Sequence, residues 1–456
     1  MISLITPTDG QVSDSIDSNN EEVQRILNNL QANILIPHGR DQAYLLFLRF
    51  TGDKDKVKEW IRTYAQNPQY VTSAAKQLED VERRRISKEN NEVPIYTGGL
   101  LGCFFLSAKG YKELGYEKEL GKFQEDSFIN GMKSRSNYYF KPQDEWLTIT
   151  NKDPLPKDWQ ISYRDEIHAM LLLAQASDEG DLNETTVQPL KADLENKGIV
   201  EKNVWVESGR RLSNKNGKEI EPFGYRDGIS NPLFFSEKTK VNPKGIFDFL
   251  SAKELVLVLD PLAEEDPEHC YGSYLVFRKL EQDKTAFNTR IETLATQATK
   301  EALKRSGAEI IGRFRDGTPR TKFDKPQGPT GDTIEFDFDG DDGRRCPLHA
   351  HIRKANPRDG RHIRIVRRGI PYNEIENDTG SGVGLLFMCY QRNIHNQFEL
   401  IQRVWVDNRN HPIIGTGVDR LIGQEWSQEI NLKYPITLQG GEYFFAPSLS
   451  FLRNLK

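Results

Sequence analysis

The sequence predicts an α+β protein made of two similar halves. Its 456 residues are more than one ordinary hydrophobic core can hold, which suggests two or three domains. Hydrophobic residues make up 37% of the chain, enough for a packed interior. A buried strand followed by a helix occurs near the start of the chain, and the same succession returns in the second half. A repeated unit of strands and helices is the simplest explanation.

We expect residues 1–20 to be a flexible arm, because residues 7–20 are polar and acidic. A short helix is predicted over 21–30, where apolar residues recur at helical spacing. Residues 42–50 are rich in aromatic and branched side chains, which predicts a buried strand. An amphipathic helix is expected to follow over 53–65.

The second half repeats this succession, with a strand predicted over 272–280 and a helix over 284–306. A second pair also matches: residues 166–174 resemble 382–390, and each stretch precedes a helix-forming segment. Chance similarity between apolar strands is the alternative to an internal duplication. The Lys-, Asn- and Gly-rich segment 195–221 is expected to contain the boundary. We place it between an N-terminal domain, 21–215, and a C-terminal domain, 216–456.

Composition excludes several classes of function. The formal charge is 62 − 67 = −5, which gives no general reason to bind nucleic acid or an anionic membrane. Nine Lys and Arg residues lie between positions 344 and 368, but that stretch has no Phe, Trp or Tyr on which a base could stack. No apolar run approaches the roughly 20 residues that a membrane helix needs. We therefore expect neither nucleic acid nor membrane as a partner.

The N-terminus lacks the basic start and long apolar core of a secretory signal. The four cysteines are scattered without a Cys-x-x-Cys pair, which argues against zinc ribbons and iron–sulfur clusters. Reduced thiols in a cytosolic protein are the better interpretation. We expect a cytoplasmic protein that is a monomer or a homodimer.

The most informative segment spans 346–358 and reads Cys-Pro-Leu-His-Ala-His-Ile-Arg-Lys-Ala-Asn-Pro-Arg. A neutral imidazole is a good ligand for haem iron or zinc, and neighbouring arginines could bind carboxylates such as haem propionates. His349 and His351 are two residues apart, so on a strand they would share one face. Half of a zinc or non-haem metal site and ordinary polar histidines both remain open on spacing alone.

A second element, Glu221-Pro-Phe-Gly-Tyr-Arg-Asp-Gly-Ile-Ser-Asn-Pro, lies upstream. It presents one carboxylate, Asp227, between Gly224 and Gly228, which permit tight backbone geometry and close approach to a flat cofactor. Asp-Gly is also an ordinary turn signal, so this motif alone is weak.

A strand predicted over 363–372 carries two adjacent arginines. Alternation separates its side chains into two faces, the first with Ile363, Ile365 and Arg367 and the second with Arg364, Val366 and Arg368. We expect the face with two isoleucines to be buried. Arg367 would then point inward, where a permanent cation needs a partner.

Together these segments resemble the dye-decolourising peroxidase family of haem enzymes, in particular its longer subgroup. The resemblance runs from about residue 33 to about residue 447 and is most specific at the histidine and Asp-Gly segments. It implies two ferredoxin-like domains, with antiparallel sheets, peripheral helices and haem b in the C-terminal domain. It also implies that hydrogen peroxide is reduced while dyes, phenols or other bulky donors are oxidised one electron at a time.

The resemblance implies specific roles as well. His351 would be the axial ligand of the iron, and Asp419 would hold its other ring nitrogen. Asp227 would be the distal acid–base that moves the proton of peroxide, and Arg367 would stabilise the departing oxyanion.

Further residues are assigned less specific roles. Arg358 is the first candidate for a contact with the haem propionates and Arg353 the second. Trp405 and Tyr372 could relay electrons from the surface, or could simply pack. His349 occupies a variable position of the family motif and is given no role.

Two rival functions remain open. One is a haem-binding or haem-handling protein with little turnover. The other is a hydrolase that uses a metal at the His-x-His pair.

Overall fold

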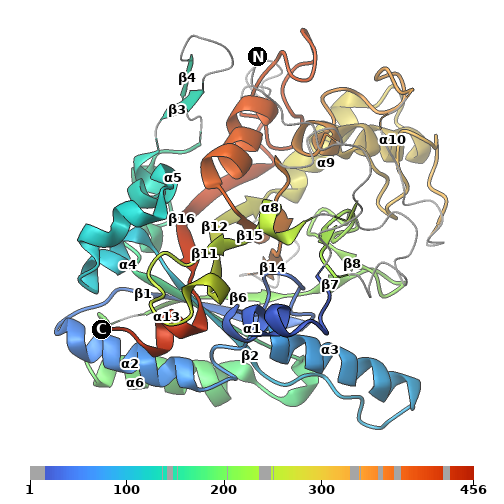
Figure 1. Cartoon of the computed structure of the whole chain (residues 1–456). Helices are drawn as coiled ribbons and strands as arrows, with labels where there is room; N and C mark the ends of the chain where they lie inside the picture. Colours follow the sequence, from blue (N-terminus) through green and yellow to red (C-terminus); the bar gives the residue numbers. More distant parts are fainter. Residues whose placement is uncertain are drawn as a thin grey trace.

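The computed structural model describes most of the chain (Figure 1). The described residues are 16–135, 137–140, 147–150, 153–202, 204–235, 248–249, 251–328, 338, 340–357, 363–373, 382–424 and 432–456. Figure 1 shows α1, α2, α3 and α6 at one end of the molecule and α9 and α10 at the other.

One ten-stranded sheet runs through both halves of the chain. Its strands are β1 (Gln42–Leu48), β2 (Leu101–Leu106), β5 (Ala169–Gln175), β6 (Trp205–Arg210), β11 (Val258–Leu259), β12 (Tyr271–Gln282), β13 (Val366–Arg367), β14 (Ile370–Asn373), β15 (Val383–Gln391) and β16 (Ile436–Ala446). The two halves meet where Phe445 of β16 pairs with Leu106 of β2. Three two-stranded sheets lie apart from it: β3 (Asn137–Phe140) with β4 (Leu147–Thr150), β7 (Leu212–Ser213) with β8 (Glu219–Ile220), and β9 (Pro232–Leu233) with β10 (Asp248–Phe249).

The two halves of the large sheet have the same strand order. In the N-terminal half the order is β2-β5-β1-β6, and in the C-terminal half it is β13 or β14, then β15-β12-β16. The strands of each half can be numbered in chain order, with β13 and β14 counted as one strand and β11 left out. Both halves then have the spatial order second, third, first, fourth, and all of these pairs are antiparallel. The strand pairs that the sequence matched, β1 with β12 and β5 with β15, therefore occupy equivalent positions. The α+β class with antiparallel pairing is confirmed, although the small β9–β10 pair is parallel.

Helices fill the connections. The α-helices are α1 (Glu21–Asn29), α2 (Lys54–Gln66), α3 (Ala74–Glu89), α4 (Ala108–Glu113), α5 (Asp126–Asn130), α6 (Gln188–Asn196), α8 (Ala252–Leu255), α9 (Lys284–Leu294), α10 (Lys300–Ile311), α11 (His351–Ala355) and α13 (Leu449–Arg453). The 3₁₀-helices are η1 (Glu117–Phe123), η2 (Met132–Ser134), η3 (Pro156–Asp158), η4 (Ile161–Tyr163), η5 (Ser177–Glu179) and η7 (Pro267–His269). The π-helices are η6 (Asn183–Val187) and η10 (Ile394–Val406).

Capping side chains explain where several helices begin. Asn20 accepts two N–H groups of the first turn of α1, and Asp53 accepts one from α2. The single helix predicted over 284–306 is wrong, because the chain leaves α9 at Ala295 and begins α10 after Thr299. The Thr299 hydroxyl accepts the N–H of Ala302 and so caps a new helix.

The described end of the predicted N-terminal arm touches the C-terminal half at one point, where the N–H of Ile16 donates to the carbonyl of Phe234 at 2.8 Å. The expectation of a flexible arm over 1–20 stays a prediction. Residues 1–15 lie outside the described residues. The domain boundary at residue 215 stays a prediction.

The interior agrees with the composition. One large apolar cluster spans the sheet in both halves, and a smaller one lies beside α9 and α10. All four cysteines are buried and unpaired, as the scattered spacing predicted. Among the helices that the structure describes, none is long and apolar enough to cross a membrane.

Candidate active site

A mostly apolar cavity opens against the C-terminal half of the sheet. Neighbouring strands supply one wall, because Arg278 pairs with Phe387 and Leu280 with Leu385, so these side chains share one face. Most of the lining is apolar: Phe223, Ile229, Leu280, Ile311, Phe314, Ile352, Leu385, Phe387, Phe398, Leu421, Ile422 and Ile436. The cavity is also lined by three residues that the sequence analysis predicted to be functional, His351, Asp227 and Arg367.

His351 is the first residue of α11 and not part of a strand. Its Nδ1 lies 2.8 Å from Oδ2 of Asp419, whose side chain is completely buried. The other oxygen of Asp419 accepts the N–H groups of Leu421 and Ile422 at 2.7 and 3.0 Å. A carboxylate held in this way accepts a hydrogen bond from Nδ1–H and leaves the lone pair of Nε2 for a ligand.

His349 does not share a face with His351, so the expected arrangement on a strand is wrong. It lies in the turn before α11 and does not line the cavity. Burial lowers the pKa of His349 to about 4, which keeps the ring neutral. Within the described part of the chain, the one group of three side chains able to hold a metal is Asp266, Glu268 and His269, so the His-x-His pair has no third ligand there.

Asp227 and Arg367 lie next to each other in the wall of the cavity. Nη1 of Arg367 lies 3.6 Å from Oδ1 of Asp227, and its Nη2 donates to the carbonyl of Ile229 at 2.9 Å. Gly224 and Gly228 have φ angles of 86° and 74°, so the turn that presents Asp227 needs residues free to adopt left-handed conformations. The site therefore combines an imidazole, a carboxylate and a guanidinium in an apolar setting.

The orientation argument for the two arginines is corrected. Instead of one strand over 363–372 the structure has the two short strands β13 and β14. Side chains do alternate over 363–370, but Arg364, Val366 and Arg368 form the buried face. The Arg368 guanidinium donates to the carbonyls of Asn33 and Ile34 in the N-terminal half, at 2.8 and 2.9 Å. Arg367 points into the cavity and not into the core.

Two arginines, Arg358 and Arg353, were predicted to contact the haem propionates. Arg358 lies outside the described residues. Arg353 is not among the lining residues, because its guanidinium pairs with Asp341 at 3.2 Å, donates to the carbonyl of Cys346 at 2.8 Å and lies over the ring of Phe338. A propionate contact for Arg353 stays a prediction. Three arginines to which the sequence analysis gave no role, Arg226, Arg278 and Arg313, do line the cavity. Alternation along the apolar strand β12 is a signal that could have identified Arg278.

The two aromatic relay candidates do not line the cavity. The ring of Trp405 stacks on His411 with centroids 5.2 Å apart. Tyr372 is buried and pairs with Gly384, which alternates with the cavity-lining Leu385, so its side chain lies on the other face of the sheet. A relay role for either residue stays a prediction.

A second cavity of about 460 Å³ adjoins the first on the side of Asp227 and Arg367. Both residues line the two cavities, and the remaining walls come from both halves of the chain, including Arg40 and Arg211. Asp227 and Arg367 therefore lie where the two cavities adjoin.

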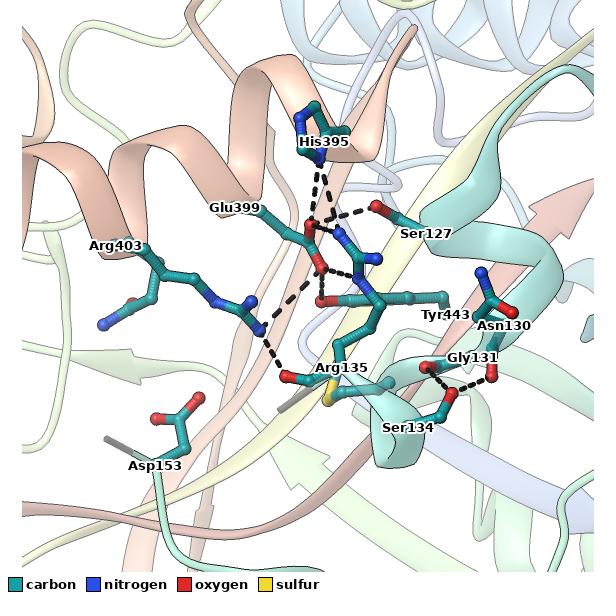
Figure 2. A network of polar contacts seen from close by, with 12 residues as sticks. Ser127, Asn130, Gly131, Ser134, Arg135, Asp153, His395, Glu399, Arg403 and Tyr443 are labelled. Atoms are coloured by element: carbon teal, nitrogen blue, oxygen red, sulfur yellow. Dashed lines mark hydrogen bonds and ion pairs between the residues drawn. The ribbon is translucent and has the colours of Figure 1, made fainter. Parts of the chain in front are cut away.

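A buried ion network fixes the helix η10, which carries the lining residue Phe398 (Figure 2). Glu399, fully buried, accepts Nε and Nη2 of Arg135 at 3.0 and 2.7 Å and the hydroxyls of Ser127 and Tyr443. Burial alone would raise the pKa of Glu399, but hydrogen bonds from His395 and Arg135 outweigh it and hold the pKa well below its ordinary value. The N-terminal half thus clamps one wall of the cavity.

Comparisons with known proteins agree with this site. A family model described as "Dyp-type peroxidase, C-terminal" matches residues 219–413. The chain is 34% identical to the "Multifunctional dye peroxidase DyP2" of Amycolatopsis sp., over 98% of this chain and 100% of that protein. The crystal structure of the DyP-type peroxidase AnaPX of Anabaena sp. has a TM-score of 0.82 and 35% identity, with 98% of both chains covered.

The DyP2 structure is also similar, with a TM-score of 0.78, 31% identity and coverage of 96% of this chain and 98% of that one. These similarities extend over both halves of the chain. The chain belongs to the DyP-type peroxidase family of haem enzymes and is an oxidoreductase that acts on peroxide.

Proposed function

We propose that this chain is a haem b peroxidase that oxidises dyes, phenols and similar bulky donors, with His351 as the iron ligand. One observation carries the proposal: the Nδ1 contact with buried Asp419 leaves Nε2 of His351 available inside an apolar cavity. The name of the related dye peroxidase supports the class of donor.

The cavity suits the cofactor. A macrocycle with a largely apolar surface fits walls of leucine, isoleucine and phenylalanine, and its iron fits a single neutral imidazole. Haem, when bound, supplies the redox centre that exchanges electrons with peroxide and with the donor. Besides Arg367, the described arginines that line the cavity and could contact propionates are Arg226, Arg278 and Arg313.

Asp227 is proposed to move the proton. Its Oδ1 accepts the N–H of Gly228 at 2.7 Å and faces Arg367, so Oδ2 can take the proton from one peroxide oxygen and return it to the other. Arg367, 3.6 Å from Asp227, stabilises the negative charge that develops on the leaving oxygen. Peroxide would reach this pair through the second cavity.

The remaining expectations stay part of the proposal. We infer that the two halves are ferredoxin-like domains, 21–215 and 216–456, since the β-α-β-β-α-β succession and the strand order occur twice. A cytoplasmic location and a monomeric or homodimeric state stay predictions, which cell fractionation and size-exclusion chromatography would measure.

An absorption spectrum with a dye assay tests the function. Protein purified with haem should show a strong Soret band, change its spectrum on addition of peroxide and then bleach an anthraquinone dye. The Asp227→Asn variant should keep the band and lose most bleaching. A Soret band without peroxide-dependent bleaching in the unaltered protein would favour a haem-handling protein instead.

A further inference from the structure

A separate cavity of about 480 Å³ lies beside the candidate active site, between α9, α10 and the chain that follows α10. Its volume is in the range typical of small-molecule sites. Its lining residues are Tyr225, Asn288, Ile291, Glu292, Lys300, Leu303, Lys304, Phe314, Arg315, Asp316 and Pro326. The floor is aromatic and aliphatic, and the rim is charged. We call it the α10 cavity.

One layer of side chains separates the α10 cavity from the active-site cavity. Tyr225 and Phe314 line both of them. Tyr225 is 5% exposed, and its hydroxyl is so close to α10 that a Cβ added at Gly307 would lie 2.3 Å from it. The ring also lies edge-on to Phe287, with centroids 6.0 Å apart. This wall is therefore fixed in place and only one aromatic ring thick.

The rim of the α10 cavity favours anions. Lys300, Lys304 and Arg315 supply three cations against the two carboxylates of Glu292 and Asp316. The Asp316 carboxylate is already engaged, because its two oxygens accept the N–H groups of Thr318 and Gly328 at 3.0 and 2.8 Å. The Arg315 guanidinium lies 5.6 Å from the centre of the Tyr225 ring, so a positive group sits directly at the aromatic floor.

We propose that the α10 cavity binds an anionic aromatic electron donor, such as a sulfonated dye, against the wall formed by Tyr225 and Phe314. This inference rests on the proposed function, which supplies peroxide as the oxidant. Two donor molecules would each lose one electron and one proton, and one hydrogen peroxide would become two water molecules. The donor need not enter the active-site cavity, because only one ring separates it from that cavity.

Charge reversal at the rim tests the site. Lys300→Glu and Lys304→Glu change exposed residues on α10, and Lys284→Glu changes an exposed lysine on α9 outside the cavity as a matched control. Each holoenzyme is titrated, without peroxide, with a sulfonated anthraquinone dye and with its unsulfonated parent, and binding is followed by equilibrium dialysis. Steady-state oxidation of both dyes and the stopped-flow reaction with peroxide are then measured.

Each rim variant should bind the sulfonated dye about 3- to 10-fold more weakly at low salt, with a matching rise in KM. The loss should shrink in concentrated salt, while binding of the unsulfonated parent and the reaction with peroxide should stay unchanged. The control variant should resemble the unaltered protein in every assay.

Unchanged affinity in both rim variants, or an equal loss in the Lys284→Glu control, would overturn the site. An equal loss for both dyes would overturn its preference for anions. The proposed function has its own test, which does not depend on the dye-binding results from dialysis. If the unaltered holoenzyme does not react with peroxide at all, the proposed function is refuted.

Discussion

Replacing each of the two adjacent arginines by leucine should have opposite consequences. Arg368→Leu should destabilise the fold, whereas Arg367→Leu should leave the fold intact and slow the reaction with peroxide. The expectation follows from their surroundings, because one guanidinium lies between the two halves of the chain and the other faces a cavity.

The loss at Arg368 can be worked out from its contacts. The residue is 6% exposed, and burial lowers its pKa to about 10. Leucine would remove the donors that now reach the carbonyls of Asn33 and Ile34. Each buried acceptor left without a partner costs about 1–3 kcal/mol, and the removed burial of a charge offsets part of the sum. We expect Arg368→Leu to lower the free energy of unfolding by about 2–5 kcal/mol.

Replacing Arg367 should change the stability of the fold less than replacing Arg368. Its side chain is 41% exposed, and its ion pair with Asp227 is a 3.6 Å contact between two partly exposed groups. Such pairs contribute about 1 kcal/mol or less. Its proposed role is to stabilise charge that develops only while the peroxide bond breaks, and removing one such donor typically slows a reaction about 10²- to 10³-fold.

Two assays separate these outcomes. Urea unfolding gives the stability of each variant, and stopped-flow absorbance gives the rate with peroxide at matched haem content. Arg368→Lys is the conservative control, because an ammonium group can still donate to the two carbonyls and should retain part of the stability. A larger loss of stability for Arg367→Leu than for Arg368→Leu, or equally slowed peroxide reactions in both folded variants, would refute the reasoning.

Three further predictions concern the histidines and the proton carrier. His351→Ala should purify with little haem while His349→Ala retains it, as measured by the Soret absorbance per protein; the reverse result would mean that the other histidine is the ligand. Asp227→Asn should keep the fold and slow the peroxide reaction in stopped-flow mixing, and a rate equal to that of the unaltered protein would remove Asp227 from the mechanism. Acid should weaken the fold between pH 6.5 and 4, because Nδ1 of His168 accepts the N–H of Phe50 at 2.9 Å and burial lowers the pKa of this ring to about 4. The unfolded chain then binds the extra proton, so this histidine alone should remove up to about 3 kcal/mol as pH falls through the window. His168→Asn should flatten that part of the profile in urea unfolding at several pH values, and an unchanged slope would contradict the assignment.

The sequence by itself determined the elements whose signal is local. The strands β1 and β12 follow from short apolar runs, and the alternation of side chains was predicted correctly over 363–370 but not over 371–372. The segments around His351 and Asp227 were identified because their residue types and spacing are contained in a dozen neighbouring positions. The pairing of His351 with Asp419, 68 residues away, required the family resemblance as well.

Tertiary structure decided what each face packs against. Alternation separates Arg367 from Arg368, but the buried face was settled by two carbonyls that arrive from residues 33 and 34 in the other half of the chain. Arg353 does not line the cavity, because its guanidinium contacts the carbonyl of Cys346 and the ring of Phe338 instead. A local pattern reports how side chains alternate along the backbone. It contains no information on the acceptors, rings and cavities that distant segments bring to each side, and these decide which side of a strand becomes a core and which becomes a site.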